Sequence, residues 1–289
     1  MPRYKLTVAY DGTEFHGWQK QEPPDPDAPK PAPGEEPVRI QMRTVQHVVE
    51  QTVREVIREP ITLMGASRTD SGVHANGQVA SFMSKPEPDK GVGWPADRGC
   101  DQLIRALNGR LPRDVLIRDA SIVHDEFNPI GDAIEKEYRY TIVSGQTRPL
   151  WDRRYVFHTW YDLDAERMGR ACELIVGEHD FASFAQISHG RKTTVRTIYE
   201  CGVLTPEPGK FVIHVRGNGF LYNMVRIIAG TMMEVGRGKI DPESIPEILK
   251  CGDRKQAGPT LPPQGLRLEW IRYDGEGNRG ATPRVVDAQ

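Results

Sequence analysis

The sequence predicts an α+β fold in which two pseudo-symmetric halves contribute antiparallel or mixed β-strands to one shared central sheet flanked by helices. Three observations support this prediction. Residues 4–10 alternate in polarity and are rich in β-forming side chains. An amphipathic helical stripe and further strands follow this first strand. The order of strand, helix and paired strands then recurs after residue 116, which suggests two related halves.

The length of 289 residues suffices for one large core or two modest ones. We assign residues 1–112 to an N-terminal half and residues 113–273 to a C-terminal half. Residues 22–43 hold seven prolines among polar side chains, which predicts an exposed insertion loop within the first half. Residues 274–289 are rich in glycine and polar side chains, a composition typical of a disordered tail.

The elements of the first half follow from side-chain spacing. Thr44 is a suitable N-cap for a helix. The apolar stripe that follows it has helical spacing and consists of Val45, Val48, Val49, Thr52, Val53 and Val56. Residues 61–65 and 78–83 predict two strands separated by a polar loop that contains glycine. A second helix is expected over residues 100–107.

The second half is predicted to contain four strands and two helices. Asp164 is the expected N-cap of the first helix, whose apolar face consists of Met168, Ala171, Cys172 and Ile175. The second is a long apolar helix from about residue 222 to residue 235. The strands are expected at residues 137–143, 199–204, 211–216 and 266–273, and the middle two should pair.

Composition narrows the class of protein. The four cysteines are far apart and form no C-x-x-C motif, and the histidines do not cluster near them at ligand spacing, so we expect reduced cysteines and no zinc or other metal. No apolar run approaches the ~20 residues that span a bilayer, and no signal-peptide block opens the chain. A soluble, cytoplasmic protein without a membrane partner is therefore expected. Residues 189–239 contain eight basic and three acidic residues, which favours phosphate binding, although a solvated run of charges would give the same count.

The segment 67–75 (S-R-T-D-S-G-V-H-A) carries the strongest chemical signal. It is polar, lies between two predicted strands, and places Arg68 two residues before Asp70. In an extended backbone such residues point to the same side. A nearby guanidinium lowers the pKa of a carboxyl group, and a nucleophilic aspartate must be ionised. The residues alone are equally compatible with an exposed loop whose surface ion pair contributes ~0–1 kcal/mol.

Residues 68–75 resemble the signature R-T-D-[AS]-G-V-H-A of the tRNA pseudouridine synthase A family. Further blocks occur in family order between residues 4 and 273. They are similar to Y-D-G-x-x-F-x-G-W-Q at 10–19, R-[TS]-V-Q at 43–46, L-N-x-x-L-P at 107–112, K-x-Y-x-Y at 136–140, G-x-[GA]-F-L-x-x-M-V-R at 217–226 and A-x-x-T-A-P-P-x-G-L at 257–266. Residues 127–133 depart from the pattern, because they read F-N-P-I-G-D-A where the family commonly has F-H-A-R-F-x-A.

The resemblance implies an isomerase that converts uridine to pseudouridine at positions 38–40 of the tRNA anticodon arm. Asp70 would be the nucleophile, in a catalytic cleft between the two halves. Tyr138 would stack on the target base, while Arg68 and Arg226 would flank Asp70 and help to displace the base from its stack. His74 would shape the loop without a chemical role. The resemblance also implies a homodimer in which one tRNA contacts both subunits, and it implies no cofactor.

Two other functions fit parts of the sequence. A non-catalytic RNA-binding protein would account for the basic segment, but it gives no reason for an arginine two residues before Asp70. A glycoside hydrolase or nucleosidase would use two carboxylates, and only Asp70 lies in a persuasive context.

Overall fold

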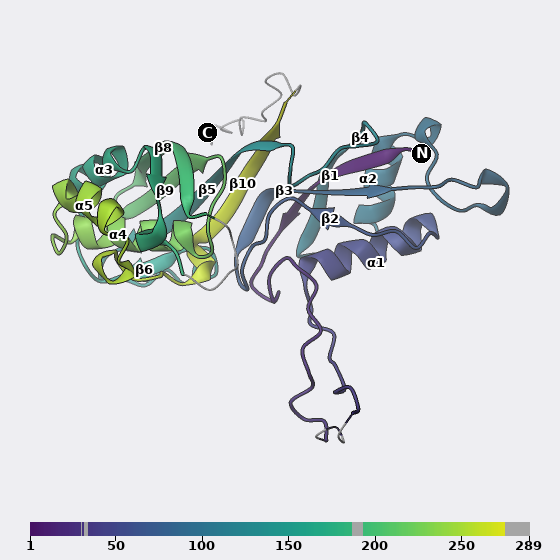
Figure 1. The fold of residues 1–289 in the computed structure, drawn as a ribbon, viewed down its shortest axis with the longest axis horizontal. Helices are drawn as coiled ribbons and strands as arrows, with labels where there is room; N and C mark the ends of the chain where they lie inside the picture. Colours follow the sequence, from purple (N-terminus) through teal and green to yellow (C-terminus); the bar gives the residue numbers. More distant parts are fainter. Residues whose placement is uncertain (30, 32–33, 187–192, 275–289) are drawn as a thin grey trace.

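In the ranges 1–29, 31, 34–186 and 193–274, which the computed structural model describes, ten strands form one mixed β-sheet (Figure 1). The strands are β1 (Arg3–Tyr10), β2 (Met64–Gly65), β3 (His74–Met83), β4 (Val115–Val123), β5 (Ala133–Ser144), β6 (Phe157–Thr159), β7 (Gly177–Asp180), β8 (Val195–Glu207), β9 (Lys210–Gly217) and β10 (Leu266–Tyr273). The α-helices are α1 (Val45–Ile57), α2 (Cys100–Asn108), α3 (Ala165–Leu174), α4 (Met224–Gly236) and α5 (Ile245–Cys251). This combination confirms the predicted α+β class.

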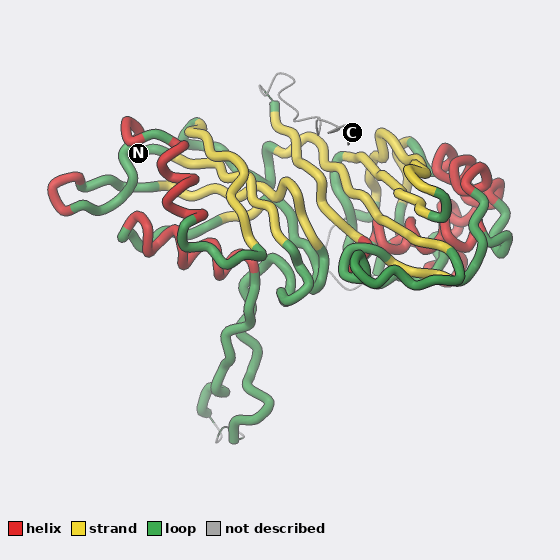
Figure 2. The backbone as a smooth tube through the Cα atoms, turned by 180° about the vertical axis from the view of Figure 1, so that it is seen from behind, coloured by secondary structure: helices red, strands yellow, loops and turns green. Residues whose placement is uncertain are grey.

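The last strand of the chain lies in the middle of the sheet. The strand order is β4-β1-β3-β10-β5-β9-β8-β7, with β2 beside β3 and β6 beside β5. Strand β10 pairs in parallel with β3 and antiparallel with β5, so it joins the two parts of the sheet into one (Figure 2). Strand β4 lies at the outer edge beside β1, although it follows residue 113 in the chain. The division of the chain at residue 112 stays a prediction.

The alternation of β1 determines which face of the sheet is covered. Tyr4, Leu6, Val8 and Tyr10 are buried, whereas the residues between them are only half-buried. Helices α1 and α2 lie with this part of the sheet, and α3, α4 and α5 lie with the part formed by β7, β8 and β9 (Figure 1). No helix in the described ranges is both long enough and apolar enough to cross a membrane.

The start of α1 differs from the prediction in how it is capped. The apolar stripe is confirmed, but the side chain of Thr44 makes no capping hydrogen bond and its hydroxyl is buried without a partner. The first amides of the helix donate instead to backbone carbonyls of a distant loop, Val45 N to Gly17 O at 3.2 Å and Gln46 N to Trp18 O at 2.9 Å. A tertiary contact thus replaces the local cap, which the spacing of residues could not indicate.

The strand predicted over residues 61–65 is wrong for most of its length, because only Met64–Gly65 forms a strand. Side chains of α1 occupy the backbone groups that a longer strand would need. Arg54 Nε donates to Ile61 O at 2.8 Å, and the amide of Leu63 donates to Glu50 Oε2 at 2.9 Å. Burial of Ile61 and Leu63 explains why the segment has the composition of a strand.

Most of the remaining predicted elements are confirmed, with ends that differ by a few residues. Strand β10 has its predicted bounds, and Asp164 caps α3 by accepting from Glu166 N at 2.9 Å and Arg167 N at 3.1 Å. Strand β4 was not predicted. Its pairing with β1 changes register next to Thr7, so its burial does not alternate regularly and the sequence pattern is weak.

The proline-rich residues 22–43 extend from the body as a long arm (Figures 1 and 2). Its two sides are joined by backbone hydrogen bonds, among them Asp25 N to Val38 O at 2.7 Å and Ile40 N to Pro23 O at 3.0 Å. The described residues of the arm form no helix or named strand. The predicted disordered tail lies outside the described residues except for Asp274.

Candidate active site

Asp70 lies in a tight turn between β2 and β3, which we call the Asp70 turn (residues 67–73). The carbonyl of Asp70 accepts from Val73 N at 3.1 Å, and Gly72 supplies the positive φ of +79° that the turn requires. A neighbouring loop holds the turn from one side. Trp18 N donates to Thr69 O at 3.0 Å, and the hydroxyls of Tyr10 and Thr69 lie 2.7 Å apart. Backbone hydrogen bonds and this contact between two side-chain hydroxyls therefore fix the position of Asp70.

Arg226 reaches Asp70 from the opposite side, from the first turn of α4. Its Nη1 lies 3.3 Å from Asp70 Oδ2 and also donates to Asn223 Oδ1 at 2.8 Å. Its Nε donates to the carbonyl of Leu261 at 2.6 Å. Three acceptors thus orient one guanidinium. The side chains are 15% exposed for Arg226 and 25% for Asp70, so the pair is screened less than a surface ion pair.

The net effect of this environment on Asp70 is opposite to the one predicted from the sequence. Partial burial raises the pKa of Asp70 above its usual value, and the charge and hydrogen bond of Arg226 lower the pKa by less than burial raises it. The predicted arginine effect is present, but desolvation exceeds it. The carboxylate is therefore more basic than an ordinary exposed aspartate.

Arg68 does not contribute to this pair. Its side chain is exposed, and within the part of the chain that the structure describes no ion pair joins it to Asp70. The expectation that residues two apart share one side applies to a regular strand, and β2 ends at Gly65, before Arg68. Whether Arg68 contacts a substrate stays a prediction.

Tyr138 lies on β5 next to the Asp70 turn. Its hydroxyl is 2.9 Å from Ser67 Oγ, and its ring packs edge-on against Phe220 with the ring centres 5.2 Å apart. Burial raises the pKa of Tyr138 to about 12, and the nearby charge of Asp70 adds to this shift. The structure thus brings Asp70, Arg226 and Tyr138 together. Sequence reasoning missed Asn223 and Leu261, although both lie inside motif blocks that the resemblance had identified.

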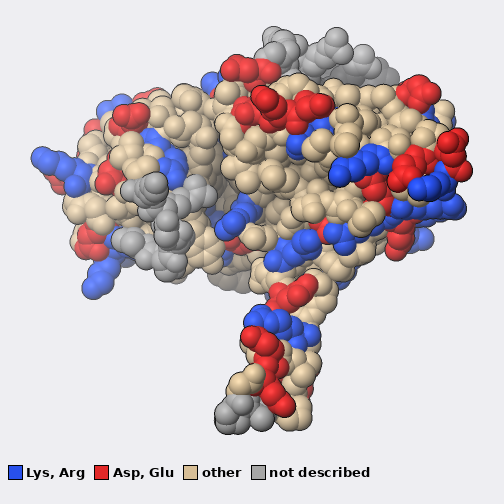
Figure 3. Space-filling model, turned by 45° about the vertical axis from the view of Figure 1, so that its right-hand side comes forward, with Lys and Arg blue, Asp and Glu red and all other residues tan. Residues whose placement is uncertain are grey.

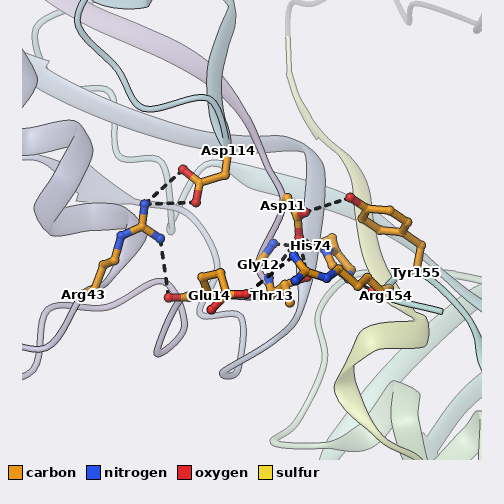
Figure 4. Close-up of polar contacts among 9 residues, drawn as sticks. All are labelled: Asp11, Gly12, Thr13, Glu14, Arg43, His74, Asp114, Arg154 and Tyr155. Atoms are coloured by element: carbon orange, nitrogen blue, oxygen red, sulfur yellow. Dashed lines mark hydrogen bonds and ion pairs between the residues drawn. The ribbon is translucent and has the colours of Figure 1, made fainter. Parts of the chain in front are cut away.

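A second polar cluster is centred on His74, the first residue of β3, which follows the Asp70 turn in the chain (Figure 4). His74 Nδ1 accepts from Gly12 N at 3.0 Å, so the ring proton is on Nε2, which donates to Arg154 O at 3.0 Å. Burial lowers the pKa of His74, and the carboxylate of Asp11 opposes this only in part. Tyr155 donates its hydroxyl hydrogen to Asp11 Oδ2 at 2.8 Å. A neutral His74 therefore links two loops.

In the described ranges no group of three His, Cys, Asp or Glu side chains is arranged to hold a metal ion. No disulfide joins any of the cysteines in the described ranges.

Several basic residues of segment 189–239 have acidic partners, for example Arg216 with Glu135 at 2.9 Å and Arg237 with Glu234 at 3.0 Å. Arg191 and Lys192 of that segment lie outside the described residues.

We expect Gly17→Ala to destabilise the Asp70 turn by about 1–3 kcal/mol in urea unfolding, because residue 17 has a φ of +85° and its new Cβ would lie 2.7 Å from Thr69 O. Gly238→Ala is the matched control. Its φ is +75°, and no heavy atom lies within 4 Å of the added carbon. Equal losses in the two variants would contradict the close contact between the loop and the turn.

Known proteins resemble this chain over nearly its whole length. The family model described as tRNA pseudouridine synthase matches residues 171–274. The chain is 40% identical over 274 residues to tRNA pseudouridine synthase A 2 of Clostridium perfringens, covering 94% of this chain and 100% of the relative. It is 41% identical over 273 residues to tRNA pseudouridine synthase A of Geotalea uraniireducens, covering 94% and 100%. For tRNA pseudouridine synthase A of Caldicellulosiruptor bescii the identity is 39% over 268 residues, covering 93% and 98%.

Proposed function

Because this chain belongs to the tRNA pseudouridine synthase A family and is therefore an isomerase acting on tRNA, we propose that it converts uridine to pseudouridine at positions 38–40 of the anticodon stem-loop, with Asp70 as the nucleophile. The observation that carries this proposal is the half-buried pair of Asp70 and Arg226. It combines a single carboxylate with one well-oriented cation. Asp70 comes from the turn between β2 and β3, and Arg226 comes from α4, which lies with the other part of the sheet (Figure 1).

The chemistry requires one carboxylate and no electron transfer. The reaction breaks the C1′–N1 bond of uridine, turns the uracil and forms a C1′–C5 bond, so C5 loses a proton and N1 gains one. Asp70 attacks C1′, attacks C6, or first removes a proton from the sugar, and each route starts from the ionised carboxylate. Partial burial strengthens Asp70 as a nucleophile or base, while Arg226 keeps the ionised form accessible.

The target uridine must leave its base stack before Asp70 can reach it, at a cost of a few kcal/mol. Tyr138 is the aromatic side chain that would stack on the extruded base, which returns roughly 1–3 kcal/mol. Its closeness to Asp70 supports this role. Arg68 is exposed on the Asp70 turn, where it would contact the displaced nucleotide or its phosphate.

The shape of the molecule suggests how the tRNA binds. We propose that the two parts of the sheet are pseudo-symmetric halves and that the hollow between them, visible in Figure 3, is the substrate cleft. In this proposal the enzyme is a cytoplasmic homodimer, and one tRNA contacts both subunits.

The test is incubation of the wild-type protein and an Asp70→Ala variant with unmodified tRNA, followed by mapping of pseudouridine. We expect pseudouridine at positions 38–40 with the wild type and none with the variant, which should still bind tRNA. Modification confined to another arm of the tRNA would contradict the proposed site. Release of free uracil would indicate a nucleosidase, and tRNA binding without any product would indicate a non-catalytic RNA-binding protein.

A further inference from the structure

An exposed group of aromatic side chains takes no part in the proposed reaction. It lies in residues 148–161, which we call the aromatic segment. Its exposed large hydrophobic residues are Leu150, Trp151, Tyr155, Trp160 and Tyr161. Trp151 is 85% exposed and Trp160 is 58% exposed, so neither contributes much to the core. Dense exposure of large apolar side chains is typical of an interaction surface.

The charges of the aromatic segment favour a polyanion as the partner. Arg148, Arg153 and Arg154 alternate with the aromatic residues, and Asp152 is the only acidic residue among residues 148–161. Arg154 has a partner, Glu14 at 3.5 Å, but both side chains are about half exposed or more. Such a surface pair contributes little and is readily exchanged for a phosphate. Aromatic rings interleaved with arginines bind unpaired nucleic acid through stacking and phosphate contacts.

The aromatic segment lies at the same edge of the sheet as the Asp70 turn. Strand β5 ends at Ser144, four residues before the segment begins, and β3 begins at His74, immediately after the turn. The hydrogen bonds of Tyr155 to Asp11 and of His74 to Arg154 fasten the segment to this edge (Figure 4). An anchored surface has less conformational freedom to lose when it binds.

We propose that the aromatic segment is a second RNA-contact surface, on which the base of an unpaired nucleotide stacks on Trp151 while Arg148 and Arg153 contact phosphates. The proposal rests on the proposed function, because the RNA is the tRNA whose uridine Asp70 attacks. The stacked nucleotide differs from the one in the active site, so the surface contributes to affinity and register and takes no part in the bond changes.

The main test compares Trp151→Ala with Trp151→Phe, and uses Tyr199→Ala as a matched control, because Tyr199 is also an exposed aromatic but lies on β8. Loss of one stacked base should raise the Kd for tRNA by about 5- to 100-fold in Trp151→Ala. Phenylalanine should restore most of the affinity, and Tyr199→Ala should bind as the wild type does. The kcat at saturating tRNA should change little in all three.

Tryptophan fluorescence gives a readout that a structural role would not move. Trp18 and Trp94 are buried and Trp270 is partly buried, so acrylamide should quench the emission of Trp151 and Trp160 most strongly. Saturating tRNA should protect this emission in the wild type, and the protection should be smaller in Trp151→Phe/Trp160→Phe. Arg148→Gln and Arg153→Gln should each reduce the slope of log Kd against log salt concentration by about 0.7–0.9.

An unchanged Kd for Trp151→Ala would overturn the proposal. So would a Trp151→Ala protein with an altered mass in analytical ultracentrifugation, because the aromatic segment would then be a contact between subunits. The result of these binding experiments can be distinguished from the result of the pseudouridine assay that tests the proposed function. If the wild type forms no pseudouridine but tRNA still protects Trp151, the catalytic assignment fails and the binding surface stands. If pseudouridine forms and Trp151 is unprotected, the reverse holds.

Discussion

Replacement of Asp70 by asparagine is expected to lower kcat for pseudouridine formation by a factor of about 10⁴ or more, because an amide supplies neither the nucleophile nor the base. The amide oxygen can still accept from Arg226 Nη1, which lies 3.3 Å from the native carboxylate. The Kd for tRNA should therefore change by less than about tenfold. Single-turnover assays with radiolabelled tRNA and a filter-binding titration measure the two quantities.

The matched control is Asp162→Asn, which removes an exposed carboxylate elsewhere and should leave kcat unchanged. Turnover within about tenfold of the wild type in Asp70→Asn would rule out nucleophilic or basic catalysis by this residue. Equal losses of binding and turnover would instead indicate that the substitution had disturbed the Asp70 turn.

The same substitution has a predicted effect on stability that depends on pH. Burial raises the pKa of Asp70 in the folded protein, so the folded state holds the proton more tightly than the unfolded state. The stability of the wild type therefore falls as the pH rises from the ordinary aspartate pKa through the raised one. Asp70→Asn has no such proton to lose. Its Tm should exceed that of the wild type at neutral pH, and the difference should vanish in acid.

Replacement of Arg226 by methionine is expected to lower kcat/KM by about 100-fold or more, because it leaves the half-buried Asp70 carboxylate without its cation. It also frees the carbonyl of Leu261, which accepts from Arg226 Nε at 2.6 Å. Arg226→Lys should restore only part of the activity, because a lysine ammonium cannot reproduce the planar guanidinium geometry that donates hydrogen bonds to three acceptors.

The pH profile separates this electrostatic role from a purely structural one. The reaction requires ionised Asp70, so kcat/KM should fall as the pH drops through the pKa of Asp70. Loss of Arg226 removes the contribution that lowers this pKa, and the acid limb in Arg226→Met should move to higher pH. Arg170→Met is the control, because Arg170 is a helical arginine whose ion pair with Glu243 is exposed. An acid limb that stays in place would contradict the electrostatic role.

The sequence predicted those elements whose side chains alternate or repeat locally. Strand β10 and the Asp164 cap are examples, because a short run of largely alternating polar and apolar residues and one capping carboxylate each act on residues nearby in the chain. Strand β4 was missed because a register shift in its pairing with β1 disturbs its alternation. Residues 61–63 were wrongly predicted as a strand because side chains of α1 bind their backbone groups. These influences come from residues far away in the chain.

The sequence by itself determined the α+β class, the chemical identity of the Asp70 turn and the family to which the chain belongs, because each depends on residue types at short, fixed spacings. Only the tertiary structure decided that Arg226 contacts Asp70 and that no such contact to Arg68 is found among the described residues. It also decided that burial outweighs the arginine in setting the pKa of Asp70. Desolvation and long-range pairing depend on which distant segments pack together, and no local pattern of residues contains that information.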